Sequence, residues 1–140
     1  MNFMNEEQMK VTLKKMKLHY LAQHFDDFVS LASKNKLAPR QLIEQLLGLE
    51  LQEAQALSTE GRLKSAKLGK FSPLANFDWN WPKKISRPTI EQLSTLKFID
   101  EPANVILIGT AGLGKTMIAK NLGYQAVLAA KCTLFPASTA

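Results

Sequence analysis

The chain has 140 residues, about the length of one domain, with 46% hydrophobic and 21% charged residues. This composition indicates a soluble globular protein, and no apolar run is as long as a membrane-spanning helix. The first residues, 1–17, are polar and lack the apolar centre of a signal peptide. A single cysteine, Cys132, excludes an internal disulfide and fits a reducing cytoplasm. Because Cys132 lies in a predicted strand, we expect its thiol to be buried and inert.

The net charge of +6 is concentrated in one part of the chain. Residues 61–97 carry 8 basic and 2 acidic side chains, whereas residues 1–60 carry 7 and 8, and residues 98–140 carry 3 and 2. A localised basic stretch indicates a polyanionic partner such as nucleic acid, and a solvated linker is the equally weighted alternative. The candidate nucleic-acid contacts are the basic side chains at the start of this stretch: Arg62, Lys64, Lys67 and Lys70.

The N-terminal part of the chain predicts a module of three helices. Apolar residues recur at helical spacing over Glu6–Lys17 and again over Leu18–Lys34. Pro39 suits the first turn of a third helix with a long apolar stripe. This helix either extends towards Ala66 or stops or bends near Gly61, because glycine in a helix interior costs about 1 kcal/mol relative to alanine.

A linker follows over residues 71–82, with two prolines, four aromatic residues and no helical period. Trp79 and Trp81 lie next to basic residues and are a candidate stacking surface for bases. The alternative is that the rings pin the linker to the following domain, and we favour it because aromatic burial alone explains them. A short helix is then predicted to start at Ser86 or Thr89 and to end near residue 96.

The stretch with the clearest chemical meaning fits the phosphate-loop (Walker A) template G-x-x-x-x-G-K-[ST]. Its eight residues are Gly109, Thr110, Ala111, Gly112, Leu113, Gly114, Lys115 and Thr116. Before the loop, the apolar and β-branched run Asn104–Ile108 predicts a buried parallel strand. After it, helical spacing predicts a helix over Met117–Ala129, and Cys132–Phe135 predicts a second strand. Strand, glycine loop and helix together favour a phosphate site over a chance glycine-rich turn.

The residue types of the loop predict how a nucleoside triphosphate binds. Glycines remove side chains where phosphate must approach, and successive amides over 112–116 can point into one concavity. The helix adds the positive end of its dipole. We expect Lys115 to reach the β- and γ-phosphates and the Thr116 hydroxyl to ligate Mg²⁺.

These elements predict an α/β fold in three parts. The parts are an N-terminal helical module over 1–70, a linker with a short docking helix over 71–102, and the start of a P-loop nucleoside triphosphatase core over 103–140. The core is expected to hold strand, P-loop, helix and strand, a truncated parallel sheet with open edges.

Hydrolysis needs a carboxylate on a later strand, a glutamate that orients water, and a cation. No acidic residue follows Glu101 in the sequence. Asp100 and Glu101 precede the first predicted strand, at its wrong end, because ligands bind at the carboxyl ends of strands. We therefore expect the first half of a catalytic site without the second.

The order of these features resembles the N-terminal part of the IstB-like transposition helper ATPases, relatives of the DnaC-type helicase loaders in the AAA+ superfamily. The loop alone would not support this resemblance, which covers about residues 6–135. The matching features after the helical module are residues 62–68, 76–78, 90–93, 98–99, 104–109 and 112–116.

The resemblance implies an ATP-dependent, self-assembling factor that binds double-stranded DNA and works with the transposase of the same insertion sequence. It implies ATP and Mg²⁺ at Gly109–Thr116, and N-terminal helices that contact the transposase or neighbouring subunits. The family's second acidic motif, sensors and arginine finger have no counterpart here, so we expect a truncated copy that does not hydrolyse ATP alone. The alternatives are a DnaC-like helicase-loader fragment, or a transposase- or DNA-binding module without nucleotide chemistry.

Overall fold

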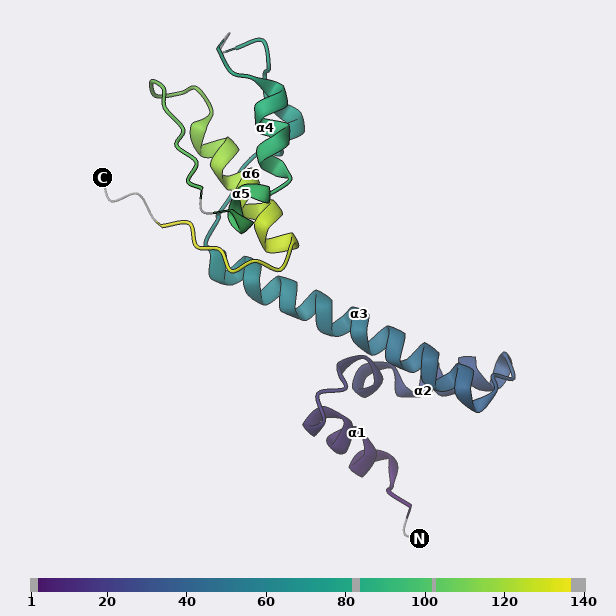
Figure 1. Cartoon of the computed structure of the whole chain (residues 1–140). Helices are drawn as coiled ribbons and strands as arrows, with labels where there is room; N and C mark the ends of the chain where they lie inside the picture. The colour runs from purple at the N-terminus through teal and green to yellow at the C-terminus, as the bar shows by residue number, and fades with distance from the viewer. Residues whose placement is uncertain (1–2, 82–83, 102, 137–140) are drawn as a thin grey trace. The chain divides into compact units, whose positions relative to one another are not determined.

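The computed structural model describes residues 3–81, 84–101 and 103–136. The chain forms two compact units, Met1–Ser58 and Thr59–Ala140. Its α-helices are labelled in chain order in Figure 1. The helices are α1 (Glu6–Lys15), α2 (His19–Lys34), α3 (Pro39–Ala66), the 3-10 helix η1 (Leu74–Asn76), α4 (Arg87–Ser94), α5 (Lys97–Asp100) and α6 (Lys115–Leu128). In the described part of the chain, no helix combines the length and apolar character needed to cross a bilayer.

The first unit begins with a helix that the sequence caps locally. The Asn5 side chain accepts a hydrogen bond from the Gln8 amide at 2.8 Å, and the Gln8 side chain accepts one from the Asn5 amide at 3.1 Å. This reciprocal pair satisfies two amides at the start of α1. α1 packs against α2, and both contribute to a core with α3. Its buried members are Leu13, Leu21 and Phe28, with Leu42, Leu46 and Leu49 packed against them.

The N-terminus of α2 is capped by a side chain from another helix. Leu18, at the N-cap position, makes no side-chain capping bond. Glu50 of α3 is only 9% exposed, and its carboxylate accepts hydrogen bonds from the amides of Leu21 at 2.8 Å and Tyr20 at 3.3 Å. A buried carboxylate at a helix N-terminus satisfies free amides and faces the positive end of the dipole. Glu50 therefore ties α2 to α3.

The third helix resolves the alternative left open at Gly61. α3 continues through Gly61 to Ala66. A Cβ atom added at Gly61 would meet nothing within 4 Å, so the glycine marks neither a close approach nor a turn. Helical spacing of the apolar residues outweighs the roughly 1 kcal/mol that one glycine costs.

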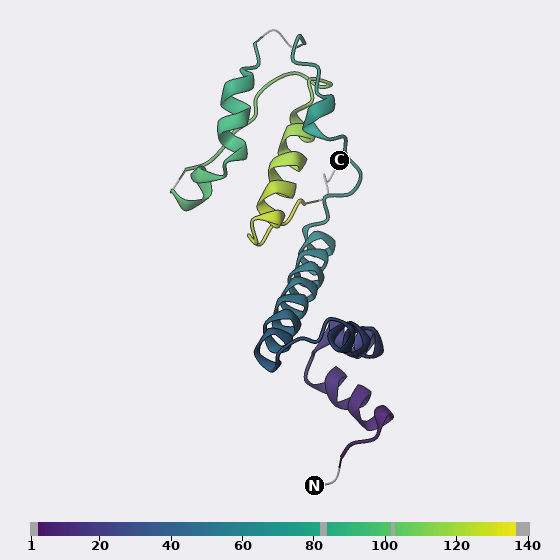
Figure 2. The same cartoon turned by 90° about the vertical axis from the view of Figure 1, so that its right-hand side faces the viewer.

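In the second unit, α4 and α6 lie side by side, and η1 packs against α6 (Figures 1 and 2). The Ser86 side chain caps α4 by accepting from the Thr89 amide at 3.4 Å, as its sequence predicts. The buried cluster between these elements contains Phe77, Ile90, Ile118 and Leu122. A smaller cluster joins the end of α3 to α6 and contains Ala66, Leu68 and Val127.

The predicted parallel sheet is wrong. No residue in the described ranges is in a β-strand, and the described chain is helical between its loops. Asn104–Ile108 is irregular, with Ile106 and Ile108 78% and 91% exposed. The apolar pattern there is local, whereas a strand exists only when a second segment accepts its backbone hydrogen bonds.

The other predicted strand, Cys132–Phe135, also lacks a ladder partner among the described residues. Instead, the amide of Phe135 donates to the carbonyl of Ala66 at 2.7 Å, at the end of α3. Cys132 is exposed, so the prediction of a buried thiol is wrong as well. That prediction depended on a strand with a covered face.

Candidate nucleotide-binding site

The backbone of the predicted phosphate loop requires glycine at two of its three glycine positions. Gly112 and Gly114 have φ values of 82° and 83°, in the left-handed region that side chains disfavour. Gly109 serves a different purpose. A Cβ atom placed there would lie 3.1 Å from Cδ1 of Leu113, so the missing side chain lets the loop close on itself.

The loop leads into α6 with its amides free. Gly114 is the N-cap of α6 and has no side chain to cap it. The first amide of α6 with a backbone partner is that of Ile118, which donates to Gly114 at 3.0 Å. Within the described ranges, no hydrogen bond engages the amides of residues 112–117. Unpaired amides at the positive end of a helix dipole form an anion-binding arrangement.

Lys115 lies at the first position of α6 and folds back across the loop. Its Nζ donates to the carbonyl oxygens of Gly109 at 2.7 Å and Thr110 at 2.6 Å. Both acceptors are neutral, and phosphate oxygens form stronger, charge-assisted bonds with an ammonium group. The next residue, Thr116, is exposed in the first turn of α6. The ammonium group therefore contacts the loop, and the threonine follows it in the turn that contains the free amides.

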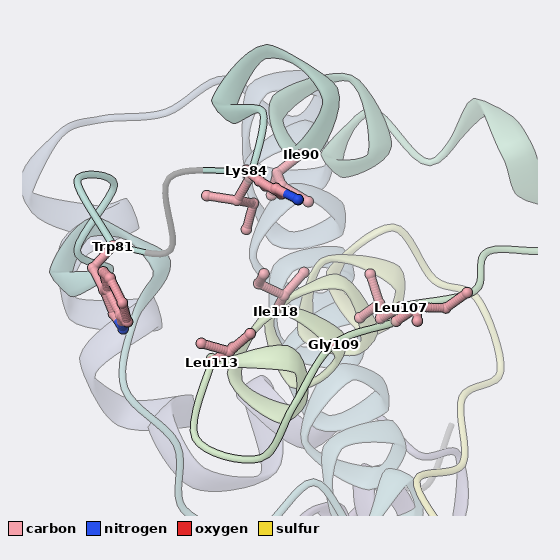
Figure 3. Close-up of a pocket in the computed structure, with 9 residues that line it drawn as sticks. Trp81, Lys84, Ile90, Leu107, Gly109, Leu113 and Ile118 are labelled. Carbon is pink, nitrogen blue, oxygen red and sulfur yellow. The ribbon is translucent and has the colours of Figure 1, made fainter.

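A pocket of about 470 Å³ adjoins the loop (Figure 3). In this view Trp81 and Leu107 lie on opposite sides, with Leu113 and Ile118 between them. The lining is mostly apolar and consists of Trp81, Lys84, Ile85, Ile90, Leu107, Ile108, Gly109, Leu113 and Ile118. Sequence reasoning did not identify this pocket, because residues from the linker, α4, the loop and α6 meet only in the folded chain.

The linker is fixed to α6 by one side chain. Asn121 donates from Nδ2 to the carbonyl of Ser72 at 2.9 Å, and its Oδ1 accepts from the amide of Leu74 at 3.0 Å. Phe77 is buried in the cluster of α4 and α6, and Trp79 packs against that cluster. Trp81 is 63% exposed. For Phe77 and Trp79, the interpretation that the rings pin the linker is confirmed. Helical spacing gave no sign of the role of Asn121.

The four basic candidates have different surroundings. Arg62 is half-buried, donating to the Val127 carbonyl at 3.3 Å and to the Thr59 hydroxyl at 3.0 Å. Lys64 is exposed and pairs with Glu60 at 2.7 Å, and this hydrogen bond lowers the pKa of the Glu60 carboxyl and raises that of Lys64. Lys67 and Lys70 are exposed. Arg62 thus helps to pack α3 against α6, while the three lysines face solvent.

No group of three or more histidine, cysteine, aspartate or glutamate side chains in the described part of the chain is placed to hold a metal ion.

A glycine loop with open amides, followed by a lysine and a threonine at the start of a helix, defines the phosphate-loop class of nucleotide-binding proteins. The family model described as "IstB-like ATP binding protein" matches residues 11–139. The chain belongs to this family, which confirms the resemblance seen in its sequence.

The chain is also similar in sequence to individual proteins from several bacteria. The "Insertion sequence IS21 putative ATP-binding protein" of Pseudomonas aeruginosa is 33% identical over 128 residues, covering 91% of this chain and 48% of the relative. The corresponding protein of insertion sequence IS5376 from Geobacillus stearothermophilus is 28% identical over 86% of this chain and 48% of its own length. An IS21-like relative from Bacteroides fragilis is 30% identical over 83% and 58%, respectively. The chain thus spans about half the length of the curated relatives it matches.

Proposed function

We propose that this chain binds the triphosphate of ATP at residues 109–116. The observation that carries this proposal is the set of free amides over 112–117, which surround the start of α6 next to the Lys115 ammonium group. Lys115 exchanges its bonds to Gly109 and Thr110 for phosphate oxygens, because a charged acceptor forms the stronger hydrogen bond. The names of the relatives, which describe ATP-binding proteins, support the same ligand.

We propose that Mg²⁺ binds with the nucleotide. Magnesium in nucleotide sites takes its ligands from phosphate oxygens, water and few protein groups. Thr116 follows the lysine and presents an exposed hydroxyl at the start of α6, which suits the one protein ligand that the phosphate-loop pattern assigns.

The pocket beside the loop is the proposed site of the base. It shares Gly109 and Leu113 with the loop, so a nucleotide whose phosphates lie on the loop can place its ring system there. Its lining is apolar except for Lys84, and an indole ring, that of Trp81, forms one side. Flat apolar walls and an aromatic ring suit a purine, which stacks on aromatic side chains.

Substitution of Lys115 tests nucleotide binding. We expect Lys115→Ala to weaken the affinity for fluorescently labelled Mg-ATP by about 10- to 100-fold, the effect of losing charge-assisted bonds of roughly 1.5–3 kcal/mol. Lys97→Ala removes the same charge from exposed α5 and serves as the matched control, with an affinity within about twofold of the parent. Equal affinities of the parent and Lys115→Ala would contradict the proposal.

We further propose that these 140 residues bind ATP without turning it over by themselves. Residues 102–140 contain no acidic side chain, and hydrolysis by this class requires carboxylates that hold the Mg²⁺ shell and orient water. The matching measurement is steady-state phosphate release, which should be the same for the parent and Lys115→Ala. Phosphate release by the parent well above that of Lys115→Ala would contradict this proposal.

Its role in the cell, we propose, is that of a transposition factor which assembles with copies of itself and acts with the transposase of its own element. The relatives are named as proteins of insertion sequences, which favours this role over that of a helicase loader. The proposal predicts capture by the transposase of the same element and no capture by the replicative helicase. The opposite pattern would establish the helicase-loader alternative.

Double-stranded DNA is the proposed polyanionic partner of the basic stretch, through the exposed lysines 64, 67 and 70. Phosphate contacts of this kind are sequence-independent and weaken as salt rises. Replacing the three lysines with glutamine should reduce DNA affinity at low salt. The slope of the logarithm of the affinity against the logarithm of the salt concentration should become shallower by about three, one for each charge removed. An unchanged salt dependence would exclude these lysines as DNA contacts.

A further inference from the structure

The linker and the phosphate loop meet at one close contact. A Cβ atom placed on Gly114 would lie 2.6 Å from Cε2 of Phe77, and 3.4 and 3.5 Å from Cζ and Cδ2 of the same ring. The ring edge therefore lies directly against the backbone of Gly114, whose φ is 83°. No residue other than glycine fits at this position while Phe77 is in place.

The ring of Phe77 is itself held firmly. Phe77 is 8% exposed, among Ile90 of α4 and Ile118 and Leu122 of α6. Its ring centroid lies 4.8 Å from that of Trp79, and the Arg87 guanidinium lies 5.4 Å from the Trp79 ring. Close-packed side chains of this kind have little room to shift, so a ring fixed in this way restricts the backbone it touches.

Asn121 fixes the same linker at a second point. Its side chain bonds the Ser72 carbonyl and the Leu74 amide, and Nδ2 also donates to the Met117 carbonyl at 2.8 Å within α6. Met117 lies in the first turn of α6, three residues after Gly114. Linker residues 72–77 are thus attached both to the loop and to the first turns of the helix whose amides face the ligand.

We propose that Phe77 and Asn121 are positioning residues that couple the linker to nucleotide binding. The proposal rests on the proposed binding of Mg-ATP at residues 109–116. The ring of Phe77 packs against Gly114 and stabilises its left-handed conformation, which sets the direction of the amides that follow. Asn121 holds the linker that carries Phe77 in position on α6. Because coupling between two equilibria is reciprocal, a nucleotide that favours this loop conformation also strengthens docking of the linker.

The first test compares two substitutions in the same buried cluster. Phe77→Ala and Leu122→Ala both remove a side chain that is 8% exposed, and the three atoms nearest to a Cβ at Gly114 all belong to Phe77. We expect Phe77→Ala to weaken Mg-ATP affinity by about tenfold, and Leu122→Ala by no more than about twofold, when both are compared below their unfolding transitions. Phe77→Leu, which restores part of the contact, should recover part of the affinity. An equal loss of Mg-ATP affinity in Phe77→Ala and Leu122→Ala would show that Phe77 acts only through the stability of the core.

A second test perturbs the contact from the side of Gly114, and every variant is compared below its unfolding transition. Gly114→Ala adds a methyl group that collides with Phe77, whereas Gly112→Ala adds one at a similar φ of 82° with nothing within 4 Å. Both variants should bind Mg-ATP weakly, because both strain the loop. Combining each with Phe77→Ala should restore about tenfold in affinity to Gly114→Ala and nothing to Gly112→Ala. The absence of selective recovery would overturn the proposal.

The reciprocal effect is measured by hydrogen exchange at the Phe77 amide, which donates to Leu74 at 3.0 Å. Saturating Mg-ATP should slow this exchange about tenfold in the parent and much less in Asn121→Ala, where the linker has lost one attachment. The Ala22 amide in the first unit is the internal control and should not change. If the parent fails to bind Mg-ATP, the proposed function fails. If it binds and the Phe77 amide is unaffected, only the coupling fails.

Discussion

Two single side chains of this protein hold elements in place where the neighbouring sequence offers no cap or anchor. Glu50 caps α2 from α3, and Asn121 holds the linker on α6, in each case through backbone groups distant in sequence. Neither role follows a motif, because the partners are backbone amides and carbonyls that any residue carries. The phosphate loop, in contrast, is predicted residue by residue by a template that fixes both residue types and spacing, and its binding of nucleotide stays a prediction.

Glu50 gives the prediction at this scale. Glu50→Ala should lower the free energy of unfolding by about 1–3 kcal/mol, because two amides at the start of α2 lose a buried acceptor. Glu50→Gln retains one carbonyl oxygen and should lose less. Glu44→Ala on the exposed face of α3 is the control and should change stability by no more than about 0.5 kcal/mol. Urea unfolding followed by circular dichroism distinguishes these outcomes, and equal effects of the two alanine variants would show that the cap contributes nothing.

The five longer helices, α1, α2, α3, α4 and α6, were predicted within a few residues of their observed ends, whereas the short helices η1 and α5 were not predicted and the strands were wrong. Helix signals such as the Ser86 cap and the spacing of apolar residues act within one or two turns, so they can be found in the sequence, whereas the cap of α2 comes from Glu50 in α3. A strand needs a partner segment, and the apolar run Asn104–Ile108 cannot specify one. The pocket and the contact of Phe77 with Gly114 were missed for the same reason, because each joins elements that are distant in sequence.

α3 contains two glycines whose replacement should stabilise the protein. Gly48 and Gly61 lie inside the helix, and a Cβ atom at either would meet nothing within 4 Å. Gly48→Ala and Gly61→Ala should each raise the free energy of unfolding by about 0.5–1 kcal/mol, because alanine loses less backbone entropy in a helix. Thermal and urea unfolding measure the gain. A loss of stability would mean that α3 bends or opens at the substituted position in solution.

At the scale of the whole molecule, the division into Met1–Ser58 and Thr59–Ala140 separates the helical core of α1 and α2 from the loop and pocket. The basic stretch 61–97 also falls within the second unit. The predicted phosphate loop and the excess of positive charge therefore belong to the same unit, which the charge pattern of the sequence alone did not reveal.

The division into two units predicts which helices a bound nucleotide stabilises. A nucleotide present at 100 times its dissociation constant stabilises the unit that binds it by about 2.7 kcal/mol. We expect Mg-ATP to slow hydrogen exchange in the helices of the second unit, α4 and α6, and to leave α1 and α2 unchanged. Mass spectrometry of peptides from both units provides the measurement, with Lys115→Ala as the control that removes the effect. Uniform protection would show that the two units unfold as one.

The uncovered segment Asn104–Ile108 has a consequence for the behaviour of the polypeptide at high concentration. It carries no charge, is rich in β-branched residues, and presents Ile106 and Ile108 to water, and its backbone forms no β-ladder with any described segment. Such a stretch is a template for cross-β association between identical molecules. Yield and shelf life should therefore be limited by fibrous precipitation that begins here, directly before the predicted phosphate loop.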